Sequence, residues 1–138
     1  MTRYALLLPI LLAAMPSAAA DGLEVRDAWI RAAPPGAIVL AGYATIENRG
    51  AGTVRLIDAS SSAFARVEFH EMRMADGLMK MRRLESVDVP AGQSVAFAPG
   101  SDHLMLHEPR HAIAKGDRIE LELVDDAGGR TRVTFEVR

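Results

Sequence analysis

Apolar and polar residues alternate along most of the chain, in short runs separated by glycine, proline, asparagine and aspartate. A period of two residues is typical of half-buried β-strands, whereas helices repeat every three or four residues. The pattern therefore predicts an all-β sandwich or barrel of about nine short strands, with a short helical turn expected only at 61–66. The expected strands cover residues 23–31, 39–48, 53–60, 66–74, 78–84, 93–98, 103–107, 117–125 and 130–137.

Two of these runs meet at Asp76-Gly77, a dipeptide that favours a tight two-residue hairpin turn. With Ala75 opposite Leu78, the register of every further pair in the hairpin is set. Opposed residues share a face, and so do alternate residues along one strand. One side of the hairpin is therefore expected to carry five potential soft-metal ligands: His70, Met72, Met74, Met79 and Met81.

The first twenty residues have the organisation of a secretory signal. Arg3 supplies a positive charge, residues 4–15 are apolar, and Ala18-Ala19-Ala20 matches a cleavage site. The apolar run is shorter than the roughly 20 residues that span a bilayer, although an uncleaved anchor is the alternative. We expect 1–20 to be a signal peptide and 21–138 to be one periplasmic domain, with no membrane span after cleavage.

Cysteine is absent from the chain, and the formal net charge is −2 with basic and acidic residues interspersed. The lack of cysteine excludes a disulfide framework and the thiolate that a blue-copper electron-transfer site requires. The charge pattern gives no reason to expect binding to nucleic acid or to anionic lipid. Neither a nucleophile elbow nor a glycine-rich phosphate loop is present, so a binding protein is expected rather than an enzyme.

Two histidines and two methionines form the strongest candidate metal site: His70, Met81, His103 and Met105. Thioether sulfur and imidazole suit the soft ion Cu(I), whereas Mg²⁺ and Ca²⁺ prefer oxygen ligands. Five of the seven methionines fall between residues 72 and 105, which argues against random scatter through a core. Neutral ligands add no charge to offset a second positive charge on the metal, so Cu(I) is favoured over Cu(II).

Other residues on the same faces have more than one interpretation. Met72 and His107 are candidate auxiliary metal contacts, although His107 could instead meet solvent at the barrel rim. Met74 and Met79 could equally fill the core, as methionine often does. His111 is expected to be an ordinary surface histidine. For the whole chain, the alternative is a β-sandwich binding module in which the cluster of histidine and methionine arose by chance and binds no metal.

The spacing from His70 to Met105 is H-x10-M-x21-H-x-M, and in this motif the chain resembles the PCuAC family of periplasmic copper chaperones. The resemblance implies a cupredoxin-like Greek-key β-barrel that holds one Cu(I) through two histidines and two methionines. It implies delivery toward the binuclear copper site of cytochrome c oxidase, with the oxidase copper-binding subunit and a Sco-type thiol protein as partners. Copper storage or detoxification in the periplasm would use the same site. The segments that share the resemblance are 27–31, 34–36, 41–43, 67–71, 76–82 and 90–92.

The chain also departs from that family in two respects. His107 stands where relatives often carry methionine, and no segment rich in histidine and methionine follows the last expected strand. We therefore expect no separate Cu(II) site in a tail.

Overall fold

The computed structural model describes residues 22–138, and all of its regular elements in this range are strands. The predicted signal peptide and its cleavage point after Ala20 lie outside the described residues. No helix within 22–138 is long and apolar enough to cross a membrane. The strands are β1 (Leu23–Ile30), β2 (Val39–Asn48), β3 (Val54–Ser60), β4 (Phe64–Ala75), β5 (Leu78–Leu84), β6 (Val87–Val89), β7 (Ser94–Phe97), β8 (His103–Pro109), β9 (Arg118–Asp125) and β10 (Arg130–Val137).

The prediction of an all-β chain is confirmed, and each of the nine expected strands is present. The tenth strand, β6, was missed because three residues are too few to show a period. It forms because Val87 and Val89 are buried in the core and pair with β3. The expected helical turn at 61–66 is wrong in its second half, where Phe64 begins β4. Phe64 is 1% exposed and pairs with β8, so core packing extends the strand.

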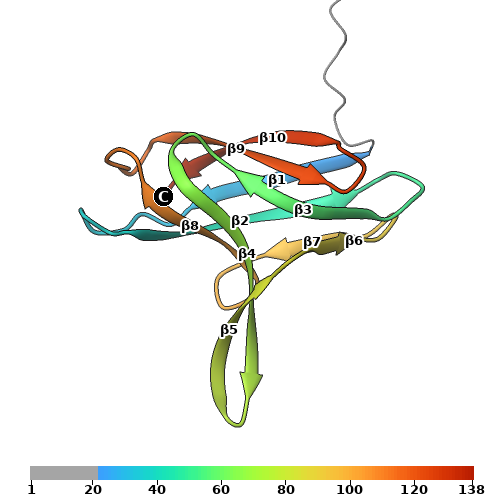
Figure 1. Cartoon of the computed structure of the whole chain (residues 1–138), viewed down its shortest axis with the longest axis horizontal. Helices are drawn as coiled ribbons and strands as arrows, with labels where there is room; N and C mark the ends of the chain where they lie inside the picture. The colour runs from blue at the N-terminus through green and yellow to red at the C-terminus, as the bar shows by residue number, and fades with distance from the viewer. Residues whose placement is uncertain (1–21) are drawn as a thin grey trace, which may run out of the picture.

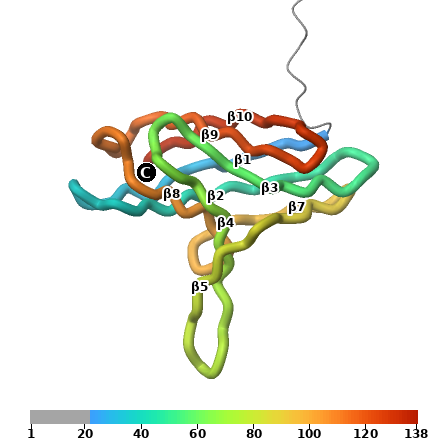
Figure 2. Tube along the Cα trace, in the orientation of Figure 1, coloured from blue at the N-terminus to red at the C-terminus, as the bar shows by residue number. Residues whose placement is uncertain are grey.

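The strands form one continuous sheet in the order β5-β4-β8-β2-β1-β10-β9-β3-β6. It curves until β3 also pairs with β4, and β7 pairs with the second half of β2. Every pairing is antiparallel in the described residues except that of β1 with β10. The result is a flattened barrel from which the β4–β5 hairpin projects (Figures 1 and 2).

The core fixes which face of β4 and β8 points outward. Val67 and Phe69 of β4, with Leu104 and Leu106 of β8, are at most 5% exposed and belong to the core cluster. Burying each such side chain stabilises the fold by about 1.5–3 kcal/mol. Because successive strand residues point to opposite faces, the even-numbered residues of β4 from Arg66 onward and the odd-numbered residues of β8 lie on the outer face.

The projecting hairpin has the predicted register. Ala75 is opposite Leu78, Met74 opposite Met79 and Met72 opposite Met81. Asp76 and Gly77 have positive φ angles of 51° and 76°, as a type I′ turn requires. Among the described strands β5 pairs only with β4, and its residues are exposed from Leu78 to Arg83. The hairpin is therefore an arm held mainly by its turn and its own ladder.

Candidate metal site

Pairing of β4 with β8 brings the predicted ligands onto one outward-facing surface. His70 is directly opposite His103, and their rings stack with centroids 5.7 Å apart and planes at 26°. Met105 follows two residues along β8, on the same face as His103. Met81 comes from β5, where it is opposite Met72. Three strands therefore supply the four residues.

His103 and Met81 are in direct contact. The Nε2 atom of His103 lies 3.1 Å from the Sδ atom of Met81, while its Nδ1–H donates to the carbonyl of Ser101 at 3.2 Å. A donor bond at Nδ1 leaves Nε2 as the unprotonated nitrogen, which is the form that binds a metal. His103 is only 8% exposed, so packing holds this orientation.

Among the described residues, one ring nitrogen of His70 has a hydrogen-bond partner and the other has none. Its Nε2 atom lies 2.9 Å from a carboxylate oxygen of Glu68, and its side chain is 12% exposed. Its Nδ1 atom is buried and has no hydrogen-bond partner among the described residues. An unpartnered buried nitrogen costs free energy, and a metal ion bound there would recover it.

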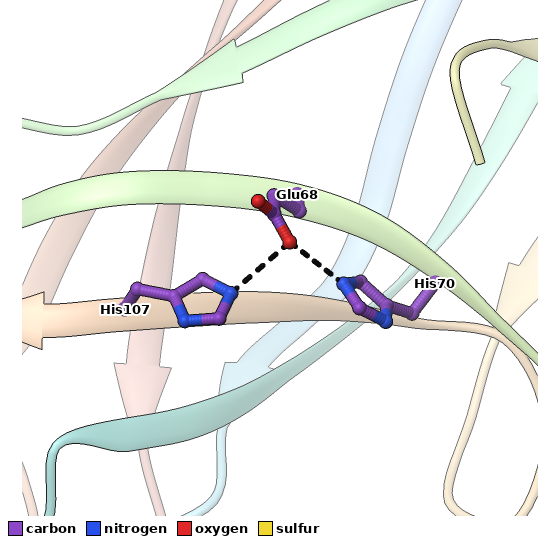
Figure 3. A group of neighbouring side chains, drawn as sticks. All are labelled: Glu68, His70 and His107. Atoms are coloured by element: carbon purple, nitrogen blue, oxygen red, sulfur yellow. Dashed lines mark hydrogen bonds and ion pairs between the residues drawn. The ribbon is translucent and has the colours of Figure 1, made fainter. Parts of the chain in front are cut away.

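Glu68 is the site residue that sequence reasoning missed. Its Oε2 atom accepts from Nε2 of His70 and lies 3.2 Å from Nε2 of His107, so the carboxylate lies between two imidazoles (Figure 3). The other oxygen, Oε1, is 2.7 Å from the guanidinium of Arg66 and 3.8 Å from that of Arg83. Hydrogen bonds from His70 and Arg66, with the charge and hydrogen bond of His107, lower the pKa of Glu68 to about 2 against the opposing effect of burial.

A signal for Glu68 was present in the sequence. Its position two residues before His70 places it on the same strand face. What was missing was the pairing of β4 with β8, which sets Glu68 opposite Met105 and brings His107 alongside. Without that pairing, Glu68 resembles any exposed polar residue of a strand.

The remaining candidates are placed as follows. Met72 is half-buried beside Met81. His107 does not simply meet solvent, since its side chain is 17% exposed and contacts Glu68. The interpretation of Met74 and Met79 as core residues is wrong, because these residues are exposed, at 65% and 49%. The arm that carries them projects from the barrel, away from the core (Figure 1).

Comparison with known sequences identifies the family. The LpqE-like lipoprotein family matches residues 23–137. The protein Lxx21020 of Leifsonia xyli subsp. xyli, a lipoprotein by name, is 32% identical over 124 residues, which are 89% of this chain and 74% of that protein. The uncharacterized protein RP573 of Rickettsia prowazekii is 28% identical over 96 residues, covering 69% of this chain and 53% of that one.

Solved structures with the same fold include PCuAC domains and the protein DR1885. The copper-bound PCuAC domain from PmoF2 superposes with a TM-score of 0.73 at 24% identity, over 90% of this chain and 98% of that domain. Apo-DR1885 from Deinococcus radiodurans gives 0.67 at 21% identity, over 100% and 93%. The expected cupredoxin-like barrel is thereby confirmed. The chain belongs to the LpqE-like family and has the fold of PCuAC domains, as its resemblance to the PCuAC family predicted.

Proposed function

We propose that this protein is a periplasmic copper chaperone that binds one Cu(I) through His70, Met81, His103 and Met105. The observation that carries the proposal is the 3.1 Å approach of the His103 Nε2 atom to the Met81 sulfur, with the imidazole tautomer set by Ser101. Two potential ligand atoms on different strands are thus already adjacent. Relatives of the same fold support the proposal, since one is named as copper-bound and DR1885 has a Cu(I)-bound structure.

The ligand chemistry favours Cu(I) at this position. Two thioethers and two imidazoles are neutral, and thioether sulfur prefers a soft ion. Zn²⁺ sites normally use cysteine, histidine or carboxylate, so zinc should compete poorly for this quartet. Only the imidazoles must lose protons before they bind, and the thioethers stay available at any pH.

The same geometry suits release of the metal by ligand exchange. His70 and His103 are largely buried, whereas Met81 is 49% exposed on an edge strand. An incoming thiolate could therefore displace Met81 first, while the imidazoles still hold the ion. An anionic thiolate is a stronger ligand for Cu(I) than a neutral thioether, so transfer to a thiolate-bearing partner would run downhill. The copper-binding subunit of cytochrome c oxidase is the acceptor we propose, with a Sco-type thiol protein as a second partner in loading it.

Ligand substitutions test the binding part of the proposal. We would measure Cu(I) affinity by competition with a chromophoric chelator for His70→Ala, Met81→Leu, His103→Ala and Met105→Leu. Each should bind Cu(I) at least about tenfold more weakly. Met79→Leu is the matched control for Met81→Leu, since Met79 lies on the same strand and face and is equally exposed. Unchanged affinity in two or more of the four variants would remove the assignment.

A transfer experiment tests delivery separately. The Cu(I)-loaded protein would be mixed with the reduced apo copper domain of the oxidase, and copper would be followed by NMR signals of both partners. We expect the ion to move to the oxidase domain. If copper stays on this protein while the same domain accepts it from a small-molecule donor, storage or detoxification becomes the better function.

A further inference from the structure

We infer that the chain carries a second metal site, formed by Glu68, His70 and His107, that takes Cu(II). The inference deepens the proposed function, because His70 would serve both this site and the Cu(I) quartet. The three residues lie together on the outer face of β4 and β8 (Figure 3). The quartet would hold reduced copper and this trio oxidised copper.

The two nitrogen–oxygen distances already match the spacing of atoms around a bound ion. Two nitrogens and one oxygen lie within 4.8 Å of one another, with the Glu68 oxygen 2.9 Å from His70 Nε2 and 3.2 Å from His107 Nε2. Atoms bound about 2.0–2.2 Å from one ion are about 3 Å apart when their bonds meet near a right angle. An ion could therefore replace the imidazole protons that now face the carboxylate, with little movement of the strands.

The trio also differs from the quartet in charge. Glu68 brings an ionised carboxylate, which offsets part of the second positive charge of a divalent ion. Arg66 and Arg83 oppose cation binding, but both approach the Oε1 atom and leave Oε2 to the imidazoles. Imidazole with carboxylate suits borderline divalent ions, and such sites generally bind Cu(II) more tightly than Zn²⁺.

Burial and strand pairing make the trio a built site. The side chains of Glu68, His70 and His107 are 11%, 12% and 17% exposed. Each is fixed by a strand whose opposite face packs in the core, and ligands on strands are held more closely than ligands on loops. The remaining exposure leaves room for a water molecule to complete the coordination of the ion.

Sharing His70 links the two sites. Its Nε2 atom faces Glu68, and its ring stacks on His103 of the quartet. Two cations on opposite sides of one imidazole would repel each other and compete for the same ring. We therefore expect Cu(I) and Cu(II) to bind antagonistically, so that one chain holds one copper ion in either oxidation state.

The test is a comparison of Cu(II) and Cu(I) affinities across the same variants. The apo protein would be titrated with Cu(II) against glycine as competitor, with EPR to detect imidazole nitrogen coupling, and with Cu(I) against a chelator. His107→Ala and Glu68→Gln should weaken Cu(II) binding at least about tenfold. Met81→Leu and Met105→Leu should weaken Cu(I) binding and leave Cu(II) within about twofold, while His70→Ala weakens both. His111→Ala is the control, because His111 lies in an exposed loop and, among the described residues, its ring is hydrogen-bonded to the Ala112 carbonyl and not to Glu68, His70 or His107.

Two further measurements separate the outcomes. His107→Met keeps the side-chain volume close and replaces an imidazole with a soft ligand, so it should lose Cu(II) affinity and fold normally by circular dichroism. Zn²⁺ should bind more weakly than Cu(II) and depend on the same residues. The inference is overturned if Cu(II) affinity is unchanged in both His107→Met and Glu68→Gln. It is also overturned if Met81→Leu weakens Cu(II) binding as strongly as those two variants do. If the Cu(I) assignment of the quartet is wrong, this will show separately, as unchanged Cu(I) affinity in the chelator competition.

Discussion

Substituting Gly77 by alanine should weaken Cu(I) binding without touching any ligand. Gly77 is the second residue of the hairpin turn and has a φ of 76°, a backbone conformation that alanine rarely adopts. A Cβ atom there would meet no atom within 4 Å, so the substitution adds backbone strain and no clash. The arm that this turn closes carries Met81, while His70 lies near its base.

The size of the effect follows from how the arm is held. An L-residue in the left-handed region costs about 1–2 kcal/mol. β5 is an edge strand with exposed side chains, and a two-stranded hairpin alone is only marginally stable, so little core burial is available to absorb the strain. If all of this strain disfavours the arm conformation that places Met81 at the site, Cu(I) affinity falls by at most about 5- to 30-fold, since 1.4 kcal/mol corresponds to a factor of ten.

Cu(I) affinity would be measured by chelator competition, beside the free energy of unfolding from urea denaturation. Gly92→Ala is the matched control, because Gly92 also has a positive φ of 71° and open space around it but lies in the turn between β6 and β7. It should lose about 1 kcal/mol of stability and keep its copper affinity. Gly77→Asn should bind better than Gly77→Ala, because asparagine tolerates the left-handed region.

Equal Cu(I) affinity in the wild type and Gly77→Ala, with the strain visible only in global unfolding, would refute the view that the arm positions Met81. Equal losses in Gly77→Ala and Gly92→Ala would show that the affinity responds to overall stability and not to the turn.

Three further outcomes are expected. Asn48→Ala should lower the free energy of unfolding by about 3 kcal/mol in urea denaturation with unchanged Cu(I) affinity, because the fully buried amide makes three hydrogen bonds to backbone groups. Glu68 has its pKa lowered from 4.5 to about 2, so its contribution to stability is complete above about pH 4.5 and lost as the pH falls toward 2. Apo wild type should therefore lose on the order of 3 kcal/mol relative to Glu68→Gln across that window in acid denaturation. Cu(I) affinity should fall as the pH is lowered from about 7 to about 5, because protons compete with Cu(I) for the imidazole nitrogens, and a constant affinity over this range would contradict two histidine ligands.

The sequence by itself determined the local features of this protein. The period of two gave the strands, because alternation depends only on which residues are apolar. Asp76-Gly77 set the hairpin register, because the turn type fixes which residues oppose one another. That register placed His70 and the methionines on one face, as the structure shows. The three-residue β6 was not predicted, since its formation depends on pairing with β3.

Only the tertiary structure decided what surrounds those residues. β4 and β8 are separated by the β5–β7 segment, and they pair because the residues of their inner faces pack into the same core. This non-local pairing sets His70 opposite His103 and brings Glu68 and His107 together, which no short-range pattern encodes. It also leaves Met74 and Met79 exposed, because the end of the arm extends beyond the barrel. Local sequence fixes the period and the turns, whereas closure of the barrel around its core fixes which strands become neighbours.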